Sequence, residues 1–246
     1  MKRTKNPAKE AEYRKRAADL VAQMTLHEKV SQMLSWAPAI ERLGIPAYNW
    51  WSEGIHGVGR AGTATVFPQA IGMAAAFDED MMEQVGNAIG VEARGKYNMC
   101  RAHGDRDIFK GLTVWAPNIN IFRDPRWGRG HETYGEDPFL TSRLGVRFVE
   151  GMQGDDPDYL QAAACAKHFA VHSGPESDRH HFNAIVSKQD LWETYLPAFR
   201  ALVKEAGVEA VMGAYNRTNG EPCCGSKTLL KDILRDKWHF DGHVTS

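Results

Sequence analysis

The sequence predicts an α/β fold: a (β/α)8 barrel-like domain that is incomplete, with about six of the eight strand–helix units present. Apolar segments of strand length alternate with helices of about 12–20 residues, which is typical of parallel βαβ units. The unusual polar residues follow the predicted strands, and in a parallel barrel these loops share the face that binds substrates. The length of 246 residues also suits a single barrel domain.

The first predicted elements are helices. Residues 8–24 form a charged amphipathic pattern, and “TLHEKVSQML” begins a second helix with Thr25 and Glu28 spaced as a capping box. The segment “TVFPQAIGMAAAF” is predicted to form loop and short strand. Asp78 is the expected N-cap of a helix that runs to about Asn98.

Four strands are expected in the remainder of the chain as parallel neighbours, near residues 113–116, 163–168, 208–213 and 242–246. The helices between them are predicted over residues 139–152, 187–206 and 227–238. The chain ends at Ser246, inside the last predicted strand. We therefore expect a single domain, residues 1–246, whose barrel is cut before it closes and whose exposed edge can associate with other molecules.

Composition limits the class of function. The chain is 43% hydrophobic and 25% charged, which is ordinary for a globular protein. A net charge of −1 and a pI of about 6.8 give no support for binding to nucleic acid or to an anionic membrane. No segment has the roughly 18 apolar residues of a membrane span. The first 20 residues lack the apolar core of a signal peptide, so a cytoplasmic location is expected.

Cysteine and histidine patterns argue against a metal centre. Cys100, Cys165, Cys223 and Cys224 form no CxxC pair, so neither a disulfide framework nor a zinc site is predicted. The histidines of “KHFAVHSGPESDRHH” lack a helical i, i+4 pair arranged with carboxylates. We expect no metal and no other cofactor.

Three loops carry candidate chemistry. “NWWSEGIHGV” sets Glu53 and His56 behind two tryptophans, a pattern that suits a sugar but equally a turn with two core rings. “FRDPRWGRGHETYGEDP” holds three arginines and four acids, most of which fit an ion-pair lattice, although one arginine can clamp hydroxyls. Lys167 and His168 are neighbours on a strand, so both reach one pocket only at its end.

These loops resemble the N-terminal barrel domain of glycoside hydrolase family 3, in its β-glucosidase and β-xylosidase branch. The resemblance covers nearly the whole chain. It is carried, in the family's order, by “MTLHEKVSQM”, “YNWWSEGIHGV”, “TVFPQAIGMAAAFD”, “VEARGKYN”, “WAPNINIFRDPRWGRGHETYGEDP”, “AACAKHFAVHSG”, “DRHHFNAIVSKQDLWETYLPAF” and “VMGAYNRTNGEPCC”.

The resemblance implies a set of substrate-binding residues: Glu53, Arg129, Lys167, His168, Met212, Tyr215 and, less directly, Trp115 and Arg179. Glu53, Arg129 and the Lys167–His168 pair correspond to groups that hold sugar hydroxyls. Met212 and Tyr215 correspond to the wall beside the nucleophile. The nucleophilic Asp is expected immediately after Ser246 and the acid/base Glu in a later domain, so neither catalytic carboxylate lies in the chain.

The implied activity is exo-acting, retaining hydrolysis of terminal β-D-xylosyl or β-D-glucosyl residues from β-linked oligosaccharides or aryl glycosides. Glu rather than Asp at position 53 favours xylosides, because the longer acid fills the space of a hydroxymethyl group. Two alternatives stay open. Asp178 and His180 reproduce the D-x-H spacing of the β-N-acetylhexosaminidase branch, and a chain without catalytic carboxylates also fits a non-catalytic sugar-binding or complementing subunit.

Overall fold

The computed structural model describes residues 3–246, which form a mixed α/β fold. The α-helices are α1 Pro7–Gln23, α2 Leu26–Ser31, α3 Ala70–Ala74, α4 Glu79–Ala102, α5 Pro138–Gln153, α6 Lys188–Asp190 and α7 Pro197–Ala201. The 3-10 and π-helical segments are η1 Glu41–Leu43, η2 Gly130–Glu132, η3 Glu176–Asp178, η4 Leu191–Tyr195, η5 Leu202–Ala206, η6 Cys223–Gly225 and η7 Lys227–Lys237. The strands are β1 Trp36–Ala37, β2 Tyr48–Asn49, β3 Thr113–Val114, β4 Ala163–Phe169, β5 Asn183–Ala184, β6 Ala210–Gly213, β7 Arg217–Thr218, β8 Glu221–Pro222 and β9 His243–Thr245.

The central sheet has the order β3-β4-β6-β9, and all its neighbours are parallel. This confirms the four predicted strands and their arrangement. Ser52 forms a parallel bridge with Val114, so the segment after β2 continues the sheet beyond β3. Parallel neighbours place the carboxyl ends of all these strands at one edge, where the loops that follow them meet.

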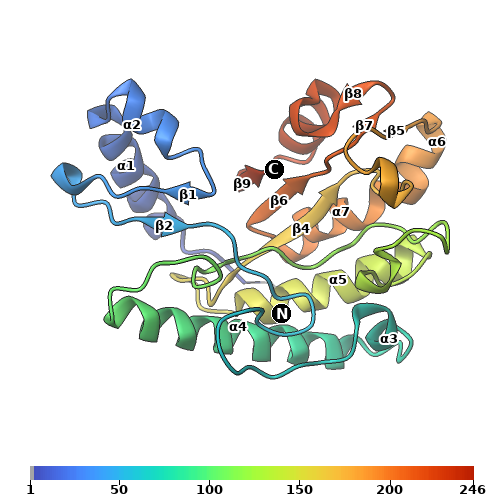
Figure 1. Cartoon of the computed structure of the whole chain (residues 1–246), viewed down its shortest axis with the longest axis horizontal. Helices are drawn as coiled ribbons and strands as arrows, with labels where there is room; N and C mark the ends of the chain where they lie inside the picture. The colour runs from blue at the N-terminus through green and yellow to red at the C-terminus, as the bar shows by residue number, and fades with distance from the viewer. Residues whose placement is uncertain (1–2) are drawn as a thin grey trace.

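The sheet curls without closing into a barrel. The ring of His243 in β9 lies 5.1 Å from the ring of Trp50, which precedes the Ser52 bridge. Helix α1 lies beside the same end of the chain, because Arg14 pairs with Asp241 at 2.5 Å. Figure 1 shows α1 and α2 on one side of the strands and β9 near the C-terminus facing them.

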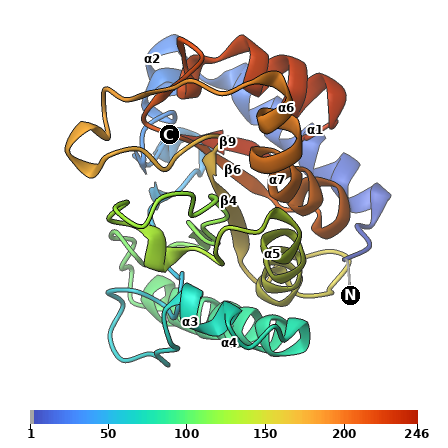
Figure 2. The same ribbon diagram turned by 90° about the vertical axis from the view of Figure 1, so that its right-hand side faces the viewer.

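Helices α4, α5 and α7 pack along the outer face of the sheet (Figure 2). Helices α4 and α5 cross closely, because a Cβ on Gly151 would lie 2.0 Å from the carbonyl oxygen of Glu83. A Cβ on Gly86 would likewise lie 2.3 Å from the carbonyl oxygen of Phe148. The large core between sheet and helices is filled by side chains such as Leu144, Phe148, Phe169, Phe199 and Leu202.

Helix starts follow the sequence signals. Thr25 and Glu28 form the predicted capping box of α2, and the Asp78 side chain accepts the Met81 N–H at the start of α4. The Ser187 hydroxyl accepts the Asp190 N–H in the same way. Helix α4 runs to Ala102, one turn beyond the expected end.

The short strand expected within “TVFPQAIGMAAAF” is absent, since residues 65–69 are irregular and α3 follows. Ala70, Met73 and Ala74 of α3 are buried, at the i, i+3, i+4 spacing of a helix face. The predicted helix over residues 187–206 is also irregular, with π-helical turns on either side of Pro197. Proline has no N–H to donate, which disturbs the regular ladder there.

Across residues 3–246, the helices lack the combination of length and apolar character that crossing a membrane requires.

Candidate substrate-binding site

A small buried cluster lines the inner face of the curled sheet and consists of Trp115, Cys165, Ala210 and Met212. Successive side chains on a strand point to opposite faces, so these residues face inward while neighbours such as Ala164 and Val211 join the outer core. Burial raises the pKa of the Cys165 thiol to about 12, so this group stays protonated and unreactive.

Glu53 and Lys167 meet above this cluster. The Lys167 Nζ lies 3.5 Å from Glu53 Oε2, and the Trp51 indole N–H donates to Glu53 Oε1 at 2.9 Å. The Trp51 ring stacks on Trp115 with centroids 5.0 Å apart and an angle of 27° between the planes. Lys167 is 3% exposed, whereas 40% of Trp51 reaches solvent. The Lys167–Glu53 contact therefore joins a buried ammonium group to a partly exposed carboxylate.

Arg129 adds a second cation beside this pair. It donates from Nε and Nη2 to the two oxygens of Glu132, each at 2.6 Å, and Asn118 Nδ2 donates to Glu132 at 3.4 Å. Burial lowers the pKa of Arg129, but the hydrogen bonds and charge of Glu132 outweigh it and hold the pKa above its usual value. Burial likewise raises the pKa of Glu132, and Arg129 and Lys167 more than reverse this. Both groups are charged at neutral pH.

His168 is fixed by an amide on the neighbouring loop. Its backbone N–H and its Nδ1 both lie 2.9 Å from Asn120 Oδ1, and Asn120 Nδ2 donates to the carbonyl oxygen of His168. Burial, and then the charge of Lys167, lower the pKa of His168 well below 6.5, so the ring is neutral. The β4–β6 register shifts between Ala166 and Phe169, an irregularity of the kind that re-aims side chains at a strand's end.

The Tyr215 ring lies near the His168 ring, with centroids 6.4 Å apart. Tyr215 is 46% exposed. The Arg179 guanidinium lies over the Tyr215 ring, 5.8 Å from its centroid, and pairs with Glu176 at 3.0 Å. The loop after β4 therefore reaches the loop after β6 above the carboxyl ends of the strands.

All eight residues selected from the sequence thus belong to one connected region, with Met212 and Trp115 forming its floor. Three supporting residues were not predicted: Trp51, Asn120 and Glu132. The tryptophan pair before Glu53 was the available signal for Trp51. The partner of Arg129 is Glu132, three positions along the chain, which accepts from Nε and Nη2 and is one of several acids in the same loop.

His172 also belongs to this region. Its ring lies 4.6 Å from His168 and 5.8 Å from Trp127. The Nδ1 atom contacts Asn216 Oδ1 at 3.2 Å, while Asn216 Nδ2 donates to two backbone carbonyl oxygens. This arrangement requires Nδ1 to carry the proton. Burial lowers the pKa of His172 to about 4, so the ring is neutral.

Two further histidines that the sequence offered, His56 and His180, have other contacts. His56 Nδ1 contacts the carbonyl oxygen of Phe67 at 2.9 Å and supports a turn. His180 packs 5.2 Å from Tyr215, so it reaches the edge of the region. Asp178 accepts through its carbonyl oxygen from the N–H groups of His181 and Phe182, and among the described residues no hydrogen bond joins it to His180. Across residues 3–246, no group of His, Cys, Asp and Glu side chains is arranged to hold a metal ion.

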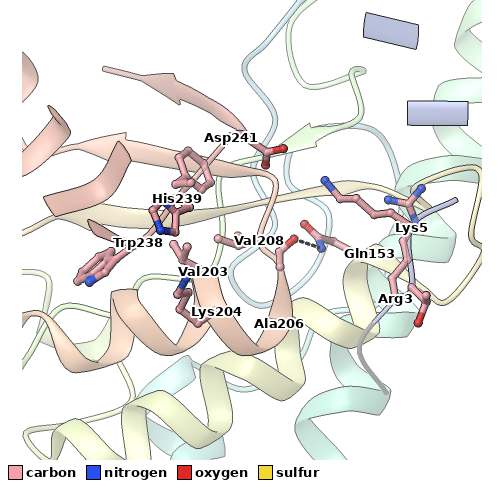
Figure 3. A pocket seen from close by; sticks show the side chains of 13 residues that line it. Arg3, Lys5, Gln153, Val203, Lys204, Ala206, Val208, Trp238, His239 and Asp241 are labelled. Carbon is pink, nitrogen blue, oxygen red and sulfur yellow. Dashed lines mark hydrogen bonds between the residues drawn. The ribbon is translucent and has the colours of Figure 1, made fainter. Parts of the chain in front are cut away.

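A separate cavity of about 540 Å³ lies at the opposite, amino ends of β6 and β9 (Figure 3). Its lining includes Lys5, Val208 and His239, and Gln153 Nε2 donates to the carbonyl oxygen of Gly207 at 3.1 Å. In parallel barrels this end of the strands contributes to stability, and ligands bind at the other end. Glu53, Arg129, Lys167 and His168, at the carboxyl ends of the strands, are therefore the candidate site, which we name the cluster around Lys167.

A parallel, curled α/β sheet with polar groups gathered at its carboxyl ends defines the barrel class of ligand-binding domains. The sequence model described as “Glycosyl hydrolase family 3 N terminal domain” matches residues 16–246, and the chain belongs to this family.

Relatives within the family support the same grouping. A xylan 1,4-beta-xylosidase from Xylanibacter ruminicola is 52% identical over 237 residues, which cover 95% of this chain and 28% of the relative. A probable beta-D-xylosidase 7 from Arabidopsis thaliana is 47% identical over 94% of this chain and 32% of its own length. The chain thus spans about a third, or less, of the length of these relatives.

Solved structures show the same fold. A GH3 exo-beta-xylosidase in complex with a xylobiose aziridine probe superposes with a TM-score of 0.86 at 38% identity, covering 94% of this chain and 31% of that structure's chain. A GH3 beta-glucosidase from Bifidobacterium adolescentis superposes with a TM-score of 0.78 at 33% identity. The superposition covers 91% of this chain and 31% of that structure's chain. The expected incomplete barrel-like fold is confirmed.

Proposed function

We propose that residues 1–246 form one barrel-type domain that binds the terminal, non-reducing sugar of a β-linked xyloside or glucoside. In this proposal the domain is the glycone-binding part of an exo-acting, retaining β-glycosidase. The observation that carries it is the Glu53–Lys167 contact of 3.5 Å beside Arg129 and His168, at the carboxyl ends of the sheet. A carboxylate accepts hydrogen bonds from sugar hydroxyls, whereas ammonium and guanidinium groups donate to them.

The aromatic residues of the cluster suit the apolar side of a sugar ring. Trp51 is 40% exposed and stacks on Trp115, so one indole face is supported while part of the ring meets solvent. The C–H face of a pyranose can pack on such a ring, as apolar groups pack on aromatic surfaces elsewhere. Binding would combine this packing with charged hydrogen bonds.

The cluster's two acids are better suited to binding than to catalysis. Glu53 is held by Trp51 and Lys167, and Glu132 accepts from Nε and Nη2 of Arg129. A retaining mechanism needs a nucleophilic carboxylate and an acid/base carboxyl about 5–5.5 Å apart. We propose, as the family resemblance implies, that both catalytic carboxyls belong to sequence outside residues 1–246 and that the isolated chain has no turnover.

Two features favour xylosides. The longer side chain of Glu53, which accepts from the Trp51 indole N–H, would fill the space of a hydroxymethyl group in the proposed glycone site. The relatives that share 52% and 47% identity with the chain are named as xylosidases. Terminal β-xylosyl residues of an oligosaccharide or an aryl glycoside are therefore the proposed substrates, with β-glucosyl residues as the second choice.

A chimera tests this function. Residues matched in the Xylanibacter ruminicola xylosidase would be replaced by this chain, and hydrolysis of 4-nitrophenyl β-D-xyloside would be followed by proton NMR. We expect turnover with retention of the β configuration and a preference for xyloside over glucoside. A folded chimera without turnover would favour a non-catalytic sugar-binding role, and an inverted product would contradict the proposed mechanism.

A further inference from the structure

Two buried histidines at and after the carboxyl end of β4 are each held by one asparagine. Nδ1 of His168 lies 2.9 Å from Asn120 Oδ1, and Nδ1 of His172 lies 3.2 Å from Asn216 Oδ1. All four residues are no more than 4% exposed. Because a neutral histidine ring carries its proton on only one nitrogen, these contacts decide what the other nitrogen can do.

The Asn120 amide has one orientation that satisfies its neighbours. Its Oδ1 faces the backbone N–H of His168 at 2.9 Å as well as the ring, and its Nδ2 faces the carbonyl oxygens of His168 at 2.8 Å and Ala170 at 3.3 Å. The reverse orientation would set the amide NH₂ against a backbone N–H and the amide oxygen against two carbonyl oxygens. Oδ1 can only accept, so Nδ1 of His168 carries the proton.

The proton on Nδ1 leaves Nε2 of His168 with a lone pair that can accept a hydrogen bond. Burial, and then the charge of Lys167, hold the pKa of His168 well below its usual value, so the second nitrogen stays unprotonated at neutral pH. Within residues 3–246 no group hydrogen-bonds to this Nε2, and the atom is not fully enclosed. It is therefore open to a group that enters the site.

His172 has the same tautomer in a different surrounding. Asn216 Nδ2 donates to the carbonyl oxygens of Val171 and Arg217, each at 2.8 Å, so its Oδ1 faces the His172 ring. Nε2 of His172 is fully enclosed and has no partner among the described residues. The two histidine rings lie 4.6 Å apart. His172 thus packs beside His168, and of the pair only His168 can offer its Nε2 to a ligand.

The direction of this hydrogen bond limits what the ligand atom can be. A hydroxyl can donate to Nε2 of His168 while it accepts from a cation such as Lys167 or Arg129. A ring oxygen or an ether oxygen can only accept, so it cannot pair with Nε2. The ring therefore selects for a free hydroxyl at one position of the sugar.

We propose that Asn120 is a positioning residue that holds His168 as a hydrogen-bond acceptor, so that one sugar hydroxyl donates to Nε2. This inference rests on the proposed function, which makes a β-linked sugar the ligand of the cluster around Lys167. It adds the direction of one hydrogen bond and assigns that direction to an amide on a different loop.

The test is nitrogen-15 NMR of the histidine rings in the 246-residue chain at pH 7, with His168→Gln and His172→Gln to assign the signals. We expect a protonated Nδ1 and an unprotonated Nε2 in His168. Saturating methyl β-D-xylopyranoside should move the His168 Nε2 signal and should move the enclosed His172 Nε2 signal much less.

Two results would overturn the inference and leave the proposed function in place. One is a protonated Nε2 in unmodified His168. The other is a His168 Nε2 signal that stays still while the backbone amides of Glu53 and Lys167 shift with the ligand. No shift at any of these groups would overturn both proposals.

The 2-, 3- and 4-deoxyfluoro analogues of the ligand identify the donating hydroxyl. Fluorine cannot donate, so one analogue should leave the His168 Nε2 signal unmoved and should bind about tenfold more weakly, as expected for one lost hydrogen bond. The other analogues should still move the signal. If all three analogues move it as the parent ligand does, no hydroxyl donates to Nε2 and the inference fails.

Asn120→Asp tests the role of the amide. A carboxylate facing Nδ1 favours the doubly protonated ring, so Nε2 of His168 should become protonated and the ligand should bind about tenfold more weakly. Asn98→Asp, at an exposed position of α4, should change neither property. An Asn120→Asp chain with a dispersed spectrum, an unprotonated Nε2 and unchanged affinity would mean that Asn120 does not position His168.

Discussion

The ammonium group of Lys167 lies 3.5 Å from the carboxylate of Glu53, although 114 positions separate the two residues in the chain. Lys167 is at the end of β4 and Glu53 follows the Ser52 bridge to β3, so the parallel sheet brings them together. The contact ties the loop “NWWSEGIHGV” to the “KHF” strand. In the proposed function, this contact offers a sugar hydroxyl both an acceptor and a donor.

Arg129 and Glu132 allow binding to be separated from stability. Arg129→Met leaves Glu132 in a largely buried position without its guanidinium, so we expect the free energy of unfolding in urea to fall by about 1.5–3 kcal/mol. The double variant Arg129→Met/Glu132→Gln should recover most of this stability without recovering sugar binding. Arg126→Met, at an exposed ion pair, should change stability by less than about 1 kcal/mol. Full recovery of binding by the double variant would show that Arg129 does not contact the sugar.

His172 should make the fold sensitive to mild acid. Burial lowers its pKa to about 4, while the unfolded chain has an ordinary histidine near 6.5. Between these values the unfolded state binds a proton that the folded state excludes, so stability falls as pH falls. The slope from this group is at most about 1.4 kcal/mol per pH unit.

Urea unfolding at pH 7, 6 and 5 measures this slope. His168 contributes in the same direction, because its pKa is also lowered by burial. His172→Gln should reduce the slope, whereas His27→Gln, at an exposed position, should not. An unchanged slope in His172→Gln would mean that His172 is not the neutral, buried group described above.

His180 separates the two enzymatic interpretations. In the chimera, Lys167→Met should lower kcat/KM by about one to two orders of magnitude, because a charged hydrogen bond contributes about 1.5–3 kcal/mol. His180→Ala should cost far less, since no hydrogen bond within residues 3–246 joins His180 to Asp178. Loss of leaving-group protonation in His180→Ala, seen as a selective loss with poor leaving groups, would favour the β-N-acetylhexosaminidase interpretation.

The apolar surface of α2 predicts self-association. Leu26, Val30 and Met33 are 77%, 58% and 85% exposed, and they lie on one short helix and the turn after it. Apolar surface gains roughly 25 cal/mol per Å² on leaving water, so the chain should associate with rising concentration in light-scattering measurements. Leu26→Glu/Met33→Glu should reduce this association. A monodisperse monomer with a cooperative melt at high temperature would contradict the prediction.

Local signals predicted much of the fold. The capping residues Thr25 and Asp78 and the alternation of apolar runs specify elements that the structure contains. The segment containing Ala70–Ala74 was misassigned because a short apolar run suits either strand or helix, and packing decides between them. Pro197 signals a disturbed helix, but the π-helical form of the turns on either side of it depends on tertiary packing and could not be predicted from the sequence.

The candidate site could likewise be predicted only in part from the sequence. Lys167, His168 and Glu53 stand in distinctive motifs at the ends of strands, so their meeting could be predicted from parallel topology. The amide of Asn120 that fixes His168 is 48 positions away, in a loop with several similar polar residues. Nothing local marks Asn120 for this contact, because the pairing depends on how two loops lie over the finished sheet.

The proposed function requires that the cluster around Lys167 bind a β-linked sugar. Its most direct test is an NMR titration of the 246-residue chain with methyl β-D-xylopyranoside. We expect saturable shifts at Glu53, Lys167 and His168, with the affinity weakened at least tenfold by Lys167→Met and unaffected by Lys188→Met at an exposed position. Shifts confined to other regions, or equal binding by the Lys167→Met chain, would contradict it.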